Sequence, residues 1–128
     1  MRLNKTYEET AIRLINELPE FEDIRESDVL IAFLSSQKEK KKSHKYILGE
    51  CIKVEDNYKW ICPYDFMIVI YEPNITGLND TQVETLIRHE LHHIGIEYAD
   101  TGLRYYIVPH DIEEFYEIIN DCGIDWSK

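Results

Sequence analysis

The sequence predicts a small α+β domain with a mixed sheet of three to four strands. Apolar residues recur at helical spacing in residues 3–18 and again in residues 80–94. Between them, the runs at 29–34 and 66–71 are short and apolar, as buried strands are. No repeat or Pro/Gly/Ser-rich linker interrupts the 128 residues, so we expect a single domain over residues 1–128.

An N-terminal helix is predicted over the first apolar pattern, which runs from Leu3 to Leu18. Thr6 and Glu9 stand three residues apart, the spacing of a capping box at a helix N-terminus. Pro19 lacks a backbone N–H, so we expect the helix to end before it.

Strands are predicted in the middle of the chain. Residues 45–55 alternate in part between apolar and polar side chains. Asp56-Asn57 favours a turn, and residues 58–62 would return as a short strand. Residues 65–71 then form the second strongly apolar strand.

A second helix is predicted from Asp80 to about Ile94. Thr81 and Glu84 have capping-box spacing, and Gly95 would end the helix.

A loop is predicted over residues 96–109, with a short extended piece at Tyr105–Val108. A C-terminal helix would begin near His110 or Asp111, whose carboxylate is typical of an N-cap, and would end at Gly123.

The chain is acidic, with 14 Lys and Arg against 25 Asp and Glu and a formal net charge of −11. Surfaces that bind nucleic acid concentrate positive charge, so this balance argues against nucleic acid as a partner. One segment differs, because residues 38–45 contain five lysines: Lys38, Lys40, Lys41, Lys42 and Lys45. We interpret this segment as a solvated hairpin tip, with a contact to nucleic acid or an acidic partner as the alternative.

Nothing in the sequence indicates a membrane or secreted protein. The longest apolar runs have six residues, whereas a membrane-spanning helix needs roughly 20. The N-terminal segment has no apolar core of a signal peptide, and three cysteines, an odd number, predict unpaired thiols. We therefore expect a cytoplasmic protein.

The motif that carries chemistry is His89-Glu90-Leu91-His92-His93, which matches the H-E-x-x-H pattern. Histidines four residues apart on a helix project from one face, so both imidazoles can bind one zinc ion. The glutamate next to the first histidine lies beside the water that zinc activates and can take its proton. We therefore expect one zinc ion per chain, with His89 and His93 as ligands and Glu90 as catalytic base.

The position of Glu90 on the helical wheel supports this assignment. At about 100° per residue, Ile87 and Leu91 lie on the core-facing arc, and Glu90 lies within that arc. An unpaired buried carboxylate costs several kcal/mol, so an ordinary amphipathic helix would not place one there. Arg88 and His92 point to the polar side, and we expect both to face solvent.

A zinc peptidase site needs a third protein ligand. His110 follows the motif after a loop long enough to bring another helix back across the site. Glu113 and Glu114 are alternative ligands, or partners that orient an imidazole. The strict metzincin pattern is absent, because Ile96 and Ala99 occupy the positions of its glycine and histidine.

These motifs resemble the phage metallopeptidase family, short proteins of phages and prophages. The family carries HEL-x-H, then HD-x-x-EF, then a closing glycine and tryptophan. The matching segments here are residues 89–93 and 110–115 with Gly123 and Trp126, and the resemblance covers roughly residues 27–126. It implies a zincin-like fold, a zinc ion and, for a phage-encoded protein, the host cytoplasm.

A more distant similarity is to the SprT-like metalloproteases, which have a third histidine in an HG-x-x-F-like segment. That similarity implies a protein substrate attached to DNA. This sequence has Asp111 in place of the glycine and lacks the C-terminal cysteine-rich zinc module of that family.

We expect a zinc-dependent metallopeptidase that acts on a protein or peptide substrate. Glu90 would take a proton from the attacking water and pass it to the leaving amine. Tyr105 and Tyr106 are candidate donors to the oxyanion. The apolar strand at 65–71 would lie near the cleft, where an edge strand can receive an extended substrate by β-augmentation.

Two other functions fit the same motif. A non-catalytic zinc-binding accessory protein could bind a basic host protein through its acidic surface. A hydrolase of this fold could also act on a non-peptide substrate.

Overall fold

The computed structural model describes residues 1–109 and shows an α+β fold. Its main sheet has the strand order β1-β2-β6-β5. The four strands are β1 (Arg2–Leu3), β2 (Ile31–Ser36), β5 (Gly49–Lys53) and β6 (Phe66–Tyr71). β2 and β6 are parallel, whereas the other two pairs are antiparallel, so the predicted mixed sheet is confirmed.

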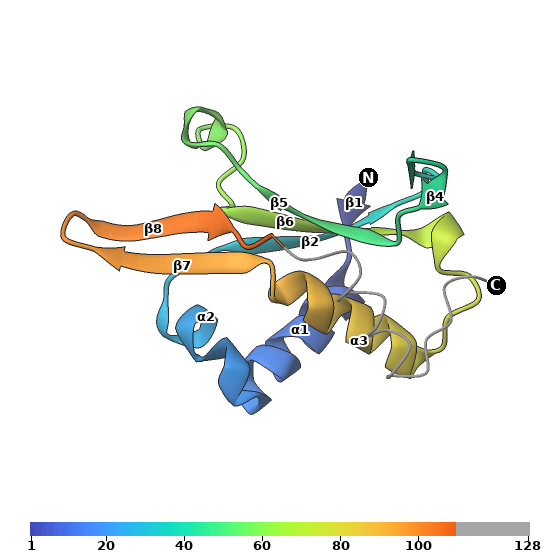
Figure 1. Cartoon of the computed structure of the whole chain (residues 1–128), viewed down its shortest axis with the longest axis horizontal. Coiled ribbons are helices and arrows are strands. Elements are labelled where there is room, and N and C mark those ends of the chain that lie inside the picture. Colours follow the sequence, from blue (N-terminus) through green and yellow to red (C-terminus); the bar gives the residue numbers. More distant parts are fainter. Residues whose placement is uncertain (110–128) are drawn as a thin grey trace.

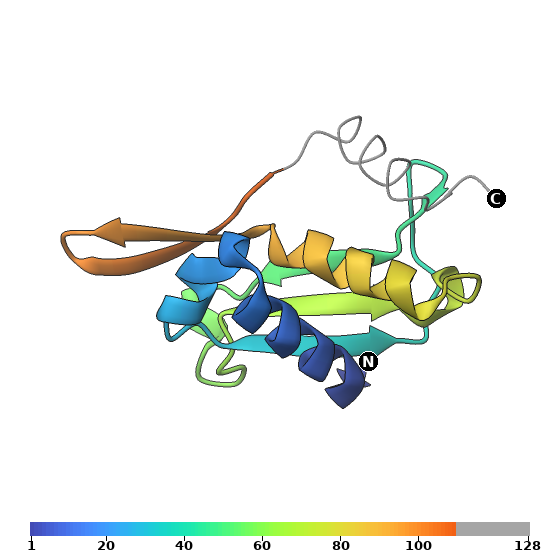
Figure 2. The same ribbon diagram turned by 90° about the horizontal axis from the view of Figure 1, so that it is seen from below.

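The helices cover one face of this sheet (Figure 1). They are α1 (Lys5–Glu17), α2 (Glu22–Glu26) and α3 (Asp80–Leu91), and the 3-10 turn η1 (Pro19–Phe21) joins α1 to α2. Figure 2 shows α1 and α3 side by side across the sheet. The buried core between the two layers includes Leu14, Phe21, Phe33, Phe66, Ile68, Ile70, Leu86, Ile87 and Leu91.

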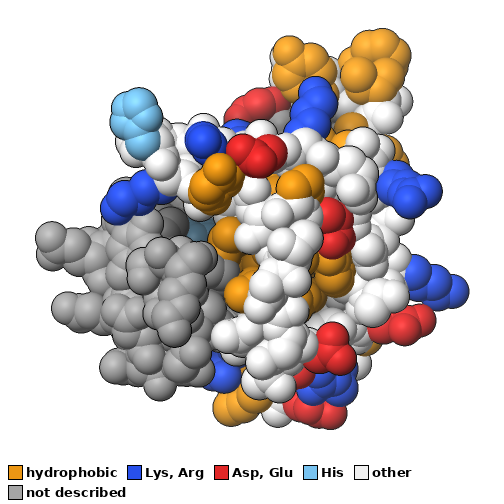
Figure 3. Space-filling model, turned by 90° about the vertical axis from the view of Figure 1, so that its right-hand side faces the viewer, with side chains coloured by type: hydrophobic (Ala, Val, Ile, Leu, Met, Phe, Trp, Pro, Cys, Tyr) orange, Lys and Arg blue, Asp and Glu red, His pale blue; other side chains and the backbone are white. Residues whose placement is uncertain are grey.

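Two β-ribbons, one long and one short, extend from the main sheet. β7 (Ile94–Ala99) and β8 (Gly102–Ile107) form a long ribbon that projects past the sheet (Figure 1). β3 (Lys41–Lys42) and β4 (Lys45–Tyr46) form a short one, closed by Ser43 and His44 at positive φ. This short ribbon is exposed, so the predicted hairpin tip in the lysine-rich segment is confirmed. Figure 3 shows lysine or arginine side chains beside a projecting histidine on this side of the molecule.

The two long helices begin with asparagine, and the predicted capping boxes at Thr6 and Thr81 are wrong. The Asn4 side chain accepts a backbone hydrogen bond in the first turn of α1. Before α3, Asn79 and Gln82 form a complete capping box, with both bonds 2.9 Å long. Asparagine is a stronger N-cap than threonine, so the earlier residue sets the start of each helix.

The strand predicted over residues 58–62 is wrong, because this segment forms a turn. It follows the 3-10 turn η2 (Asp56–Tyr58), and the N–H groups of Ile61 and Cys62 both donate to the Tyr58 carbonyl. The antiparallel partner of β5 is the more apolar β6, which satisfies the ladder without residues 58–62.

The predicted end of α3 and the predicted loop over residues 96–109 are also wrong, whereas the extended piece expected at Tyr105–Val108 lies largely within β8. The helix ends at Leu91, and the expected loop over residues 96–109 is largely the β7–β8 ribbon. A two-residue turn closed by Gly102, with φ of 119°, makes the ribbon possible. Gly95 is a strand residue, and the ring of its cross-strand partner Tyr106 fills the space of a β-carbon.

Some predictions fall outside the described residues. The C-terminal helix from His110 or Asp111 to Gly123 is among them, as is Cys122. Within residues 1–109, Cys51 and Cys62 are free thiols, as predicted. In the same range, no helix is both long and apolar enough to cross a membrane.

Candidate active site

α3 carries the H-E-x-x-H motif at its C-terminal end, against the core. Leu86, Ile87 and Leu91 are fully buried along its inner face. Glu90 is only 4% exposed on the same face, which confirms the wheel prediction for this carboxylate. The helix therefore places a titratable group where packing alone would select an apolar side chain.

The structure brings the two histidines predicted as ligands together. The Nε2 atoms of His89 and His93 lie 3.1 Å apart, and the two rings are nearly perpendicular, at 82°. Two nitrogens bound to one tetrahedral zinc ion at about 2.0–2.1 Å lie about 3.3–3.4 Å apart. The spacing of the pair is therefore close to that of two ligands on one metal ion.

His93 reaches this position from a turn beyond the helix. α3 ends at Leu91, His92 is the C-cap, and the His93 N–H donates to the Glu90 carbonyl at 3.1 Å. The spacing of four residues thus produces the histidine pair although the α-helix does not continue through it. The position of His93 consequently depends on contacts outside α3.

Val108, just after β8, supplies two of those contacts. The His93 Nδ1 atom lies 2.6 Å from the Val108 carbonyl oxygen, and the Val108 N–H donates to the His93 carbonyl at 2.7 Å. Because a carbonyl oxygen only accepts, the proton of this bond belongs to Nδ1. The lone pair of His93 is then on Nε2, which faces His89. Such a backbone bond commonly orients metal-binding histidines.

The carboxylate of Glu90 has an altered pKa. Burial, and secondarily the negative charge of Glu50, raise the pKa of Glu90 to about 8 when no cation is present. A cation held by the histidine pair would stabilise the carboxylate and oppose this shift.

Gly49 makes room for Glu90 on the neighbouring strand. A β-carbon at position 49 would lie 3.4 Å from Glu90 Oε2, 3.2 Å from the Val69 carbonyl oxygen and 3.1 Å from Ile70 Cδ1. Each of these distances is at or below ordinary contact. A glycine inside a strand often marks such a close approach, and this signal was present in the sequence.

Glu50, next to Gly49, is the centre of a polar network that the sequence did not reveal. Lys40 Nζ lies 2.8 Å from both of its carboxylate oxygens, and the Tyr71 hydroxyl donates to it. Burial raises the pKa of Glu50, but the bonds from Lys40 and Tyr71 outweigh burial, so the pKa is lowered overall. Asn74 fixes the same region by donating to the Lys40 and Ile47 carbonyls at 3.0 and 2.7 Å.

Cys51 lies near Glu90 but has the environment of a core residue. It packs against the hydrophobic core, and burial, together with the charge of Glu90, raises the pKa of its thiol to about 12. A thiol with so high a pKa is an inert filler rather than a nucleophile.

Tyr105 and Tyr106 have other contacts in the described structure. The Tyr105 ring packs edge-on against Phe66 at 6.0 Å, and Lys59 Nζ lies 5.8 Å from its centroid. The Tyr106 ring covers Gly95. An oxyanion role for these tyrosines stays a prediction.

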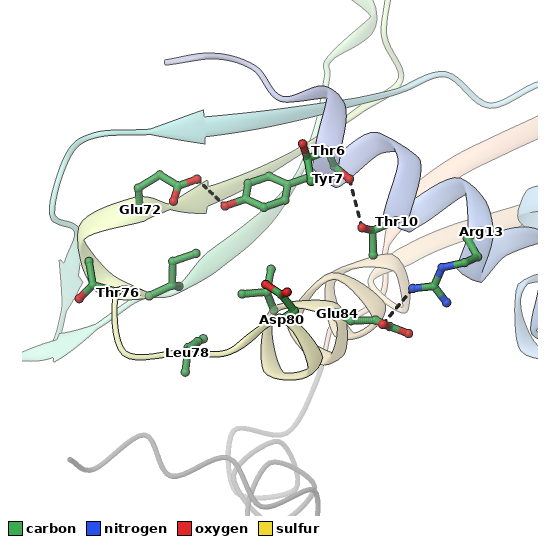
Figure 4. Close-up of a pocket in the computed structure, with 11 residues that line it drawn as sticks. Thr6, Tyr7, Thr10, Arg13, Glu72, Thr76, Leu78, Asp80 and Glu84 are labelled. Carbon is green, nitrogen blue, oxygen red and sulfur yellow. Dashed lines mark hydrogen bonds and ion pairs between the residues drawn. The ribbon is translucent and has the colours of Figure 1, made fainter.

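A cavity of about 530 Å³ lies at the other end of α3 (Figure 4). It is lined from α1, from the segment after β6 and from the first turns of α3, including Asp80 and Glu84. Tyr7 donates to Glu72 on one side of it, and Arg13 pairs with Glu84 on the other. The motif histidines do not line this cavity, so it is separate from the candidate active site.

The residues predicted to supply the third metal ligand lie beyond residues 1–109. Among these residues, no group of three or more His, Cys, Asp or Glu side chains is arranged to hold a metal ion. The residues predicted for this role, His110 with Glu113 or Glu114 as alternatives, lie outside the described part of the chain.

Comparison with known proteins assigns the chain to a family. The sequence pattern of the family described as "Putative phage metallopeptidase" matches residues 2–128. The chain belongs to this family. No curated protein and no solved structure matches it. The closer of the two resemblances is therefore confirmed, and none of the comparisons shows the SprT-like similarity.

Membership of the phage metallopeptidase family agrees with the geometry of the site. The family's name implies a metal and a peptide substrate. The paired Nε2 atoms of His89 and His93 suit a divalent metal ion that imidazole binds, and zinc is such an ion. Glu90, the residue after His89 in the chain, is buried.

Proposed function

We propose that this chain is a zinc-dependent peptidase whose site is built on His89, Glu90 and His93. The observation that carries the proposal is the bond from His93 Nδ1 to the Val108 carbonyl oxygen, which orients the ring so that its Nε2 lies 3.1 Å from the Nε2 of His89. A pair oriented in this way has the spacing of two zinc ligands. One zinc ion per chain is proposed.

His110 is the proposed third ligand. It follows Val108 by two residues, and two peptide units span at most about 7 Å. The Val108 carbonyl, which orients His93, is thus close to His110 along the chain. Glu113 and Glu114 stay as alternatives, as ligands or as partners of a ligand.

Glu90 is proposed as the proton carrier of the reaction. Zinc, when bound, lowers the pKa of water to about 7 and polarises the carbonyl group of a substrate. Glu90 then accepts a proton from the attacking water and returns it to the nitrogen of the leaving amine. Its burial at 4% exposure keeps bulk water from competing for that proton.

The strand available to an extended substrate is β5 rather than β6. The sequence favoured the run at 65–71 as an edge strand, but β6 lies between β2 and β5 and is paired on both sides. Among the residues that the structure describes, β5 is the outer strand of the main sheet, and it begins at Gly49, which adjoins Glu90. We propose that a peptide substrate adds to β5 as a further strand.

The test is Glu90→Gln, with zinc-loaded protein and fluorescently labelled casein as an unfolded probe substrate. Zinc content should equal that of the unmodified protein, while hydrolysis should fall by at least about 100-fold. Glu97→Gln, which removes an exposed carboxylate from β7, is the matched control and should cleave normally. Hydrolysis retained in Glu90→Gln would overturn the mechanism. Zinc-loaded protein that cleaves nothing would favour the non-catalytic accessory protein.

A further inference from the structure

The carboxylate of Glu20, which lies outside α3, bonds to two side chains at the C-terminal end of that helix. Glu20, in the turn η1, bonds to Arg88 Nη2 through Oε1 and to His92 Nε2 through Oε2. The Glu20 side chain is 27% exposed, compared with 49% and 48% for Arg88 and His92. The ring of Phe21, the next residue, packs against the His92 ring at 4.8 Å.

Each of the two residues held by Glu20 adjoins one of the two histidines proposed as metal ligands. Arg88 precedes His89, and His92 lies between Leu91 and His93. Since α3 ends at Leu91, His93 depends on the geometry of the terminal turn. On one side Val108 holds that turn, through two bonds to His93. On the other side Glu20 and Phe21 hold it, through the side chain of His92.

Motion of the last turn of α3 would lower the affinity of the site for a metal ion. The last turn of a helix lacks internal partners for its carbonyls and frays readily. If the turn moved, the Nε2 atoms of His89 and His93 would leave their 3.1 Å spacing, and metal binding would have to restore it. A bridge that spans one helical turn, from Arg88 to His92, opposes this motion directly.

We propose that Glu20 is a positioning residue for the metal site. Its carboxylate fixes the turn that presents His93 to His89 and thereby raises the affinity for the metal without touching it. This inference rests on the proposed function, in which the two histidines bind zinc.

The chain offers a matched control for Glu20→Ala. Glu84 pairs with Arg13 at 2.9 Å, so it ties the opposite end of the same helix to α1 (Figure 4). Both substitutions remove one carboxylate that links α3 to a neighbouring element. A purely structural role would therefore give Glu20→Ala and Glu84→Ala similar losses in thermal stability and similar zinc affinities.

The measurement is zinc affinity, by competition with a chromophoric chelator, together with the visible absorption spectrum of the cobalt(II)-substituted protein. We expect Glu20→Ala to weaken zinc binding about tenfold and to change the cobalt spectrum. Glu84→Ala should stay within about twofold of the unmodified protein. Glu20→Gln keeps an oxygen that accepts from Arg88, so it should recover part of the affinity.

A double substitution tests the route through His92. If Glu20 acts through that side chain, Glu20→Ala with His92→Ala should weaken zinc binding little more than Glu20→Ala alone. Equal zinc affinity in Glu20→Ala and the unmodified protein would overturn the role of Glu20 and leave the proposed function intact. An equal loss in Glu84→Ala would also overturn it. Absence of zinc binding by the unmodified protein would instead overturn the proposed function, and this inference with it.

Discussion

His93 Nδ1 lies 2.6 Å from the carbonyl oxygen of Val108, 15 residues further along the chain. This bond joins the end of α3 to the end of the β7–β8 ribbon. The bond orients His93, one of the proposed metal ligands. His110 follows Val108 by two residues in the sequence. The contact between His93 and Val108 thus links the H-E-x-x-H motif to the segment expected to complete the site.

Gly49→Ala should disturb both the sheet and Glu90. The new methyl group would lie 3.2 Å from the Val69 carbonyl oxygen, which is backbone and cannot move aside, and 3.4 Å from Glu90 Oε2. We expect a loss of about 1–3 kcal/mol in the free energy of unfolding, measured by urea denaturation. Gly77→Ala is the control, since nothing lies within 4 Å of its added β-carbon. Equal stability of the two variants would show that Gly49 is not needed for space.

Metal-free protein should become less stable as pH rises, because of Glu90. Its pKa is about 8 in the folded protein and about 4.3 in the unfolded chain, so between these values the folded state binds more protons. The stability due to neutral Glu90 is fully present below about pH 4.3 and is lost as pH rises through about 8. After treatment with a chelator, the stability of Glu90→Gln relative to the unmodified protein should therefore rise with pH across this range, from almost no difference near pH 4.3 to a gain on the order of 5 kcal/mol above about pH 8.

The measurement is chemical denaturation of both proteins at a series of pH values. Other carboxylates titrate in both, so the difference between the two curves isolates Glu90. Curves that run parallel from pH 5 to pH 9 would contradict the shifted pKa.

Asn74→Ala should loosen the base of the lysine-rich hairpin. The Asn74 amide donates to the carbonyls of Lys40 and Ile47. These two residues lie at the base of the β3–β4 ribbon, just before β3 and just after β4. Loss of both bonds should cost about 1–2 kcal/mol of stability and speed amide hydrogen exchange at Ile47, whose N–H bonds to Lys40. Asn57→Ala, at an exposed position, is the comparison. Unchanged exchange at Ile47 would mean that other contacts hold the ribbon.

The core elements could be predicted because their signals are local. The period of apolar residues identified α1 and α3, and the run at 66–71 identified β6. The burial of Glu90 also followed from the wheel, since residues three and four apart share a helix face. These predictions needed no knowledge of which elements meet in space.

The missed features depend on contacts distant in sequence. The β7–β8 ribbon arises from pairing between Ile94–Ala99 and Gly102–Ile107. These segments do not alternate strictly between apolar and polar side chains, so the sequence pattern does not predict the strands. Val108 acts through its backbone, so its side chain carries no signal. Glu20 and Glu50 gain their roles from partners 68 and 21 residues away, Arg88 and Tyr71. Only Gly49 carried a signal in the sequence, because a glycine in a predicted strand often marks the close approach of another group.

Zinc stoichiometry by native mass spectrometry, on protein purified without a histidine tag, tests the central claim most directly. The unmodified protein and His44→Ala, a control at an exposed turn, should each bind about one zinc ion per chain. His89→Ala, His93→Ala and His110→Ala should lose it or bind it far more weakly. Zinc retained only in His110→Ala would assign the third position to Glu113 or Glu114. No zinc uptake by the unmodified protein, or undiminished binding by His89→Ala and His93→Ala, would contradict the account.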